Sequence, residues 1–217
     1  MPYFKNNNIN LLFIHIPKTG GSSFELYLSN KYNIPLDNNS IFDFINNNAN
    51  IKINSSLQHL LYKDIMKYKD YFNIDLNNLS IITIVRNPYN RIISDLFWSK
   101  KIDVNTSKEA VFNIIQKYLY EECDNHNIPQ YLFVTDEKKQ LIKNITLLHT
   151  ETLNQDIKNL GYEDFDIKVN DNKDSVNYDN YLNNDSIKLI NKFYHYDFVI
   201  FNYKKATKSG MCSNKVI

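Results

Sequence analysis

A buried-strand pattern that runs into two glycines constrains this chain more than any other feature. Residues 11–16 read Leu-Leu-Phe-Ile-His-Ile, Gly20 and Gly21 follow, and a helix-like pattern continues from Ser22. Glycine allows a sharp turn and a close approach of the backbone to a ligand. The N–H groups that begin a helix point outward with partial positive charge, so they bind anions. The segment therefore predicts a strand–turn–helix unit with a phosphate-binding loop near residue 20.

Polar side chains around these glycines strengthen that prediction. Lys18 adds a point charge, and the hydroxyl groups of Thr19, Ser22 and Ser23 add hydrogen-bond donors. The loop of nucleotide triphosphatases ends in Gly-Lys-Ser/Thr, whereas here the lysine precedes the glycines. The dinucleotide fingerprint Gly-x-Gly-x-x-Gly is also absent from the sequence. The mechanism of anion binding is shared with those loops, but the order of the parts is different.

A second strand–turn–helix unit follows in the middle of the chain. Its strand pattern spans Ile81–Val85, and Asn87 and Pro88 are typical of a helix cap and a first helical position. Arg86 stands at the end of the strand, and Ser94 lies two helical turns further on. Open α/β sheets bind nucleotides at the carboxyl ends of their strands. We therefore expect Arg86 and Ser94 to face the ligand that the first unit holds.

Together these blocks resemble the sulfotransferases that use 3′-phosphoadenosine 5′-phosphosulfate (PAPS), most closely their carbohydrate (Golgi-type) branch. Residues 14–23 contain the family pattern Pro-Lys-Thr/Ser-Gly-Gly/Ala-Thr/Ser-Ser, and residues 82–94 contain Arg-Asn-Pro-Tyr-x-Arg-x-x-Ser. The resemblance implies that the first block binds the 5′-phosphosulfate and the second binds the 3′-phosphate. The residues concerned are Lys18, Thr19, Gly20, Gly21, Ser22 and Ser23 for the first role, and Arg86 and Ser94 for the second.

Sulfuryl transfer to a hydroxyl gains from a general base and from a cation at the leaving phosphate. Lys18 suits the cation. His59 is the predicted base, because an imidazole titrates near neutral pH and the resemblance implies a His or Glu base there. His126 is an alternative base or a substrate contact. Lys173 and Ser175 stand in a late loop that in the family often closes over the nucleotide, with a polar turn as the alternative.

Other polar residues have structural interpretations that compete with functional ones. His15 belongs to the buried-strand pattern and is expected in the core, and Glu151 is expected to cap the helix that follows it. Arg91 either joins the phosphate site or pairs with an acidic neighbour. Trp98 is expected in the core rather than against an adenine. The spacing of His, Cys and Asp residues in the sequence matches no metal site, so no metal is expected.

Composition and charge limit the remaining function classes. The 217 residues suffice for one domain with a sizeable core, and a formal net charge of +1 gives no broad field for nucleic acid or a membrane surface. Two distant cysteines predict neither a disulfide framework nor an oxidising compartment. The apolar run at 11–16 is too short to span or target a membrane, so we predict a cytoplasmic protein.

The alternation of strands and helices predicts a single α/β domain over residues 1–217 with a parallel sheet flanked by helices, and the resemblance implies the P-loop-like sulfotransferase fold. Residues 1–10 are expected to form a loose lead-in, 163–182 a loop, 197–203 the closing segment, and 204–217 a mobile polar tail. The predicted strands are Leu11–Ile16, Ile81–Val85 and Ile145–His149. The predicted helices are Ser22–Lys31, Ile41–Asn46, Leu60–Phe72, Pro88–Lys101, Lys108–Cys123, Leu153–Leu160 and Ser186–Tyr196.

The predicted reaction is in-line transfer of the sulfuryl group from PAPS to a hydroxyl of a carbohydrate acceptor, with a histidine base and with PAP as the other product. Three alternatives stay open: a sulfotransferase for tyrosine or a small alcohol, a kinase that binds a nucleotide phosphate, and a catalytically silent binding protein. Turnover of ATP with Mg²⁺ would favour the kinase. Binding of PAP without transfer to any acceptor would favour the silent protein.

Overall fold

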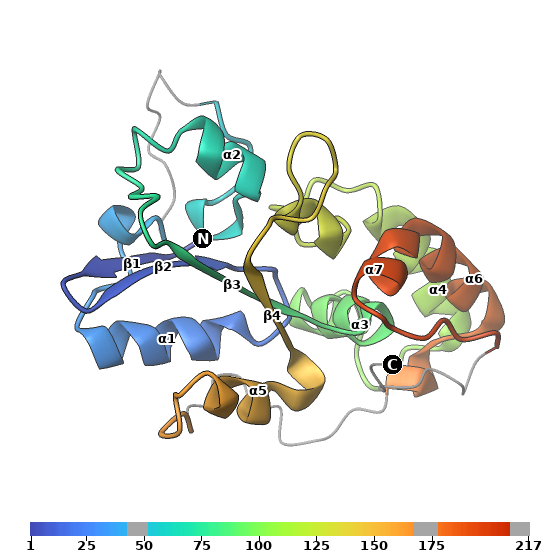
Figure 1. Ribbon diagram of the computed structural model, residues 1–217. Helices are drawn as coiled ribbons and strands as arrows, with labels where there is room; N and C mark the ends of the chain where they lie inside the picture. Colours follow the sequence, from blue (N-terminus) through green and yellow to red (C-terminus); the bar gives the residue numbers. More distant parts are fainter. Residues whose placement is uncertain (43–51, 167–177, 209–217) are drawn as a thin grey trace.

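A four-stranded sheet with the order β1-β2-β3-β4 forms the centre of the computed structural model, which describes residues 1–42, 52–166 and 178–208 (Figure 1). The strands are β1 (Tyr3–Asn6), β2 (Ile9–Ile14), β3 (Ser80–Val85) and β4 (Ile145–His149). β2, β3 and β4 are parallel, which confirms the predicted parallel sheet for these three strands. β1 is antiparallel to β2.

The first residues differ from the predicted loose lead-in. Tyr3–Asn6 is an edge strand joined to β2 by a tight turn, and Met1 and Phe4 are fully buried. Successive side chains of a strand point to opposite faces. Tyr3 accordingly joins one hydrophobic cluster and Phe4 joins the other. The polar residues that suggested a lead-in are those of the hairpin turn.

The helices cover both faces of the sheet. Their bounds are α1 (Gly21–Tyr32), α2 (Tyr62–Lys67), α3 (Pro88–Trp98), α4 (Lys108–Tyr118), α5 (Leu153–Asn159), α6 (Asn184–Phe193) and α7 (His195–Ile200). Short 3₁₀ turns are η1 (Asn38–Ser40), η2 (Leu57–His59), η3 (Gln130–Val134), η4 (Thr150–Thr152) and η5 (Tyr178–Tyr181). In Figure 1, α1 and α5 lie below the sheet and α2 lies above it.

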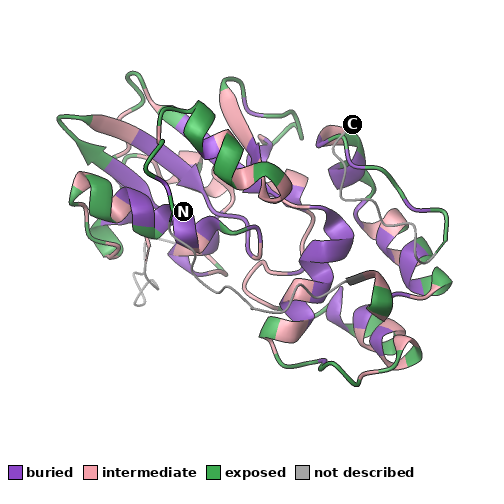
Figure 2. Ribbon diagram, turned by 90° about the horizontal axis from the view of Figure 1, so that it is seen from below, coloured by how far each residue is buried: buried purple, intermediate pink, exposed green. Residues whose placement is uncertain are grey.

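The strands divide their side chains between two cores. In β2, Leu11 and Phe13 pack with α1 and α5, whereas Leu12 and Ile14 pack into the larger cluster that includes α3, α4, α6 and α7. Figure 2 shows the result, with buried residues along the strands and exposed ones on outer helix surfaces and loops. A strand buried on both faces has a continuous apolar sequence, which is the pattern at residues 11–14.

The predicted helices are confirmed in most places; α1 is slightly longer than predicted, and α2, α3, α4 and α5 are shorter. The helix predicted over 60–72 is only the short α2, followed by turns, and the one predicted over 186–196 is two helices that meet at Tyr194. Residues 43–46 of the predicted helix 41–46, most of the predicted loop 163–182 and positions 209–217 of the tail lie outside the described residues. Within the described part of the chain, no helix is long and apolar enough to cross a membrane.

The carboxyl ends of the parallel strands meet at one edge of the sheet. The turn to α1 follows β2, the turn to α3 follows β3, and Thr150 follows β4. The Thr150 hydroxyl donates to the carbonyl of Thr19 (2.6 Å) and also approaches that of Val85 (3.1 Å). The third strand thus ties the first two turns together, which brings the two predicted phosphate-binding segments to one place.

Candidate functional site

The β2–α1 turn presents backbone donors at the amino end of α1. Gly20 is the N-cap in a left-handed conformation (φ 91°) and has no side chain that could occupy the first N–H groups of the helix. Lys18 is also left-handed (φ 67°), which is uncommon for a residue other than glycine. A Cβ atom on Gly21 would lie 3.0 Å from the His15 ring. Both glycines are therefore needed for the shape of this turn.

The side chains of this turn divide between a cavity and the interior. Lys18, Ser22 and Ser23 line the cavity, whereas Thr19 is fully buried and its hydroxyl donates to the Ile16 carbonyl (2.8 Å). The structure therefore does not place the Thr19 side chain where a ligand contact was predicted. Burial is the largest influence on the pKa of Lys18 and lowers it.

Backbone groups of the β3–α3 turn are hydrogen-bonded to protein side chains. The Asn87 side chain caps α3 by accepting from the Tyr89 N–H (3.0 Å), and Pro88 begins the helix. Gln130 binds Arg86 on both sides, since its Oε1 accepts from the Arg86 N–H (2.9 Å) and its Nε2 donates to the Arg86 carbonyl (2.8 Å). The Arg86 guanidinium donates to the Lys18 carbonyl (3.0 Å). The arginine of the second turn thus lies against the backbone of the first.

Asp197 holds the segment that binds Arg86. Its carboxylate, fully buried in α7, accepts from the N–H groups of Gln130 and Tyr131, both at 2.9 Å. Burial raises the pKa of Asp197 to about 6, although the two N–H donors oppose this rise. Two short segments far apart in sequence, at 130–131 and at 197, therefore hold Arg86 in place.

A cavity of ≈ 430 Å³ opens between the two turns. The predicted site residues that line it are Lys18, Gly20, Gly21, Ser22, Ser23, His59, Arg86 and Ser94. Lys173, like Ser175, lies outside the described residues. The remaining lining includes His15, Gln58, Trp98, Asp124 and His126. The two blocks that were singled out in the sequence thus share one cavity with the predicted base.

His59 is held by a carboxylate that the sequence did not predict. Its Nδ1 lies 2.7 Å from Oδ2 of Asp124, and the Ser56 hydroxyl donates to the same oxygen (2.8 Å). Burial lowers the pKa of His59 to about 4, although the bond to Asp124 opposes this fall. The ring is therefore neutral at pH 7. With Asp124 accepting the Nδ1 proton, Nε2 carries the lone pair.

The Asp124 carboxyl group is subject to burial and to hydrogen bonding, which shift its pKa in opposite directions. Burial raises the pKa of its carboxyl group, but the hydrogen bonds from His59 and Ser56 together outweigh burial, so the pKa is lowered. The carboxylate stays charged and orients the imidazole. The available sequence signal was its place next to the Asn125-His126 segment, which carries no spacing that points to His59.

A comparison with known protein families identifies the family of this chain. The model of the sulfotransferase family matches residues 1–204. The chain belongs to the sulfotransferase family. Sulfotransferases move a sulfuryl group to an acceptor hydroxyl, and the family generally uses PAPS as the donor. No curated protein and no solved structure matches the chain.

Three histidines form a row through the sulfotransferase site. The ring centroids of His15 and His59 are 5.4 Å apart, and those of His59 and His126 are 4.8 Å apart, each pair edge to face. Each ring meets its own carboxylate, on Glu25 (2.5 Å), Asp124 (2.7 Å) and Asp95 (2.8 Å) respectively. His15 is buried, as predicted. The possible ligand atoms of His59, Asp124 and His126 lie within 4.8 Å of one another, a grouping that a metal ion could use and that the sequence spacing did not indicate.

Three residues of the sulfotransferase have roles other than those predicted. Arg91 is 2% exposed and donates to the backbone carbonyls of Pro17, His126 and Ile128 (2.6–3.0 Å). This buried guanidinium holds the walls of the site together. Glu151 does not cap α5 but accepts from the Asn87 N–H and the Tyr203 hydroxyl, both at 2.8 Å. Trp98 is 60% exposed, so its predicted place in the core is wrong.

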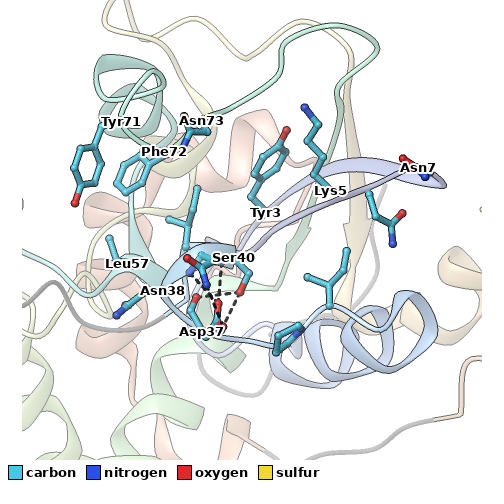
Figure 3. A pocket seen from close by; sticks show the side chains of 15 residues that line it. Tyr3, Lys5, Asn7, Asp37, Asn38, Ser40, Leu57, Tyr71, Phe72 and Asn73 are labelled. Carbon is cyan, nitrogen blue, oxygen red and sulfur yellow. Dashed lines mark hydrogen bonds between the residues drawn. The ribbon is translucent and has the colours of Figure 1, made fainter.

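A larger cavity of ≈ 990 Å³ lies beside β1 and is lined by residues such as Tyr3, Lys5, Asp37 and Tyr71 (Figure 3). Its charged side chains already have partners. Lys5 pairs with Asp75 (2.8 Å), and Asp37 caps η1. It contains none of the predicted site residues. The smaller cavity is therefore the candidate active site of this sulfotransferase.

Proposed function

We propose that this sulfotransferase moves the sulfuryl group of PAPS to a hydroxyl of a carbohydrate and releases PAP. The observation that supports this most is the single cavity that both phosphate-binding blocks share with His59. A donor with phosphates at both the 5′ and 3′ positions needs two separate anion-binding groups. The acceptor hydroxyl needs a base within reach of the transferred group.

Backbone and side-chain groups would bind the 5′-phosphosulfate of the donor, and side chains would bind its 3′-phosphate. Lys18, the hydroxyls of Ser22 and Ser23, and the N–H groups that begin α1 would bind the 5′-phosphosulfate. Arg86 and Ser94 would bind the 3′-phosphate, the guanidinium by its planar fork. Thr19 would contribute through its backbone alone, because its hydroxyl is bonded to the turn itself.

His59 would act as the general base. Nε2 accepts the proton of the acceptor hydroxyl while that oxygen forms a bond to sulfur and the bond from sulfur to the 5′-phosphate oxygen breaks. The leaving phosphate gains negative charge, which the Lys18 ammonium and the α1 N–H groups stabilise. The negative charges of the bound donor raise the pKa of His59 from its value of about 4 in the free enzyme, which makes the imidazole a stronger base during the reaction.

Titration calorimetry with PAP, with ATP–Mg²⁺ as the comparison, tests the donor. We expect micromolar or tighter binding of PAP and much weaker binding of ATP. Absence of PAP binding by folded protein would overturn the proposal, and tighter binding and turnover of ATP would indicate a kinase.

Transfer from labelled PAPS to saccharides then tests the reaction and its base. The His59→Gln variant should bind PAP normally but lose at least about 10²-fold in kcat. His195→Gln is the matched control, because His195 is an exposed residue of α7 that does not line the cavity. Unchanged kcat in His59→Gln would remove His59 as the base.

A further inference from the structure

Trp98 occupies an unusual position for a large apolar side chain. It ends α3 and is 60% exposed, yet it lines the active-site cavity. Of the large hydrophobic side chains that are exposed in the described part of the chain, Trp98 is the one that lines this cavity. An exposed indole at a binding site is a flat apolar surface that a ligand can cover.

The surroundings of Trp98 place it at the reacting end of the cavity. Its ring stacks on His126 with centroids 4.8 Å apart and an interplanar angle of 17°. The Lys18 ammonium lies 5.2 Å from the centroid of the indole. The rings of His126 and His59, the proposed base, meet edge to face with their centroids 4.8 Å apart. The indole is therefore next to the groups proposed to handle the leaving phosphate and the acceptor proton.

The rest of the lining decides what kind of molecule fits there. Around the indole the cavity presents hydrogen-bonding side chains, including Ser56, Gln58, Ser94 and Asp124, while Pro17 and Phe42 are its other apolar side chains. A pyranose has one apolar face of C–H groups and a rim of hydroxyls, which matches an exposed indole within a largely polar wall. A tyrosine ring or a small apolar alcohol would need a largely apolar sleeve.

We propose that Trp98 is the platform of the acceptor subsite, on which the apolar face of a sugar ring packs while the polar wall binds its hydroxyls. This inference rests on the proposed function. Packing on the indole orients the sugar so that one hydroxyl faces His59. Trp98 is therefore a specificity-determining residue, and its loss should affect the acceptor and spare the donor.

Fluorescence provides a direct test, because Trp98 is the only tryptophan among the 217 residues. The PAP complex is titrated with lactose, diacetylchitobiose and maltotriose, and separately with a tyrosine peptide. We expect at least one saccharide, and not the peptide, to change the tryptophan emission with saturation. If the peptide alone does so, or if no saccharide does, the inference is overturned.

Kinetics of variants separate this inference from the proposed function. Trp98→Ala should raise the acceptor KM about ten-fold, Trp98→Phe should raise it less, and the Kd for PAP should stay within about two-fold in both. Tyr120→Ala is the control, because Tyr120 is 79% exposed and does not line the cavity. An unchanged acceptor KM in Trp98→Ala, with active enzyme, overturns the platform alone. A wild-type protein that binds no PAP overturns the proposed function instead.

Discussion

The two turns that border the cavity differ in how their helices are capped and in which groups they offer to a ligand. The β2–α1 turn has a glycine N-cap and two left-handed residues, Lys18 and Gly20, so its backbone donors face the cavity. The β3–α3 turn has a side-chain cap, and the backbone of Arg86 is bonded to Gln130. The first turn can bind an anion with its backbone. The backbone of the second turn is held by Gln130 and Glu151, and this turn offers side chains to the cavity.

This difference suits the two ends of the proposed donor. The transferred group needs several donors that converge on charge that develops during the reaction, which a helix amino end provides. The 3′-phosphate does not change during the reaction and needs affinity alone. A fixed arginine provides that affinity by a bidentate contact. Variants of the first turn should therefore change the rate, and variants of the second should change donor affinity.

The largest effect is expected for Lys18→Ala. Removing the cation beside the leaving phosphate should lower kcat about 10³-fold, while the Kd for PAP rises less than about ten-fold, because the α1 N–H groups remain. Steady-state kinetics and calorimetry measure the two quantities. Lys5→Ala is the matched control, since Lys5 pairs with Asp75 beside the other cavity. A large rise in Kd with unchanged kcat would contradict the division of roles between the turns.

Arg86→Ala should give the next largest effect, on affinity. The Kd for PAP should rise about 10²-fold through loss of a charge-assisted bidentate contact. Adenosine 5′-phosphosulfate, which lacks the 3′-phosphate, should bind the variant and the wild type within a few-fold of each other. Equal losses for both ligands would mean that Arg86 acts through its bond to the Lys18 carbonyl rather than through the 3′-phosphate. Lys188→Ala, on the exposed surface of α6, serves as the control.

Both turns could be predicted from the sequence because their signals are local. Glycines, a capping asparagine and a proline act on their immediate neighbours, and the apolar runs before them set the strands. β1 was missed because its two buried residues, Tyr3 and Phe4, owe their burial to two separate hydrophobic clusters, which a short window does not include. The bounds of α2 were wrong because helical spacing persists past Lys67 into residues that form turns.

The supports of the site could not be predicted because they join distant parts of the chain. Asp124 meets His59 across 65 positions, and Asp197 meets Gln130 across 67. Such pairs carry no periodicity, since each partner alone is an ordinary polar residue. Arg91 shows the same limit. Its type and spacing matched a ligand contact, but folding places three backbone carbonyls around it.

His59 and Asp197 should change the stability of the fold in opposite directions as the pH falls. The pKa of His59 is about 4 in the folded protein against an ordinary 6.5, so between these pH values the unfolded chain binds a proton that the folded chain does not. His59 therefore lowers the free energy of unfolding as pH falls from 6.5 to 4. The pKa of Asp197 is about 6 against 3.8, so Asp197 adds stability below pH 6 and loses it as pH rises through 6.

The contributions of His59 and Asp197 fall in overlapping pH ranges, and the His59→Asn variant should isolate that of His59. The wild type loses free energy of unfolding between pH 6.5 and pH 4.5 because unfolded His59 takes up a proton. The variant has no such proton uptake at position 59, so its loss over the same pH range should be smaller by roughly 2 kcal/mol. Denaturant titrations at the two pH values measure the difference. The comparison with the wild type cancels the acidic groups that do not contact His59, but not Asp124, which does. Parallel changes in the two proteins would show that the folded and unfolded chains protonate His59 alike.

The smallest effect is expected for Asn87→Ala, and it bears most directly on the contrast between the turns. Loss of the cap on the Tyr89 N–H should cost about 1 kcal/mol and lower Tm by about 2–4 °C. The Kd for PAP should hardly change, because the Asn87 side chain caps α3 and does not line the cavity. A more than ten-fold weaker binding of PAP at nearly constant Tm would mean that this turn also binds through its N–H groups. The two turns would then differ in how firmly they are capped, and no longer in which part of the chain meets the ligand.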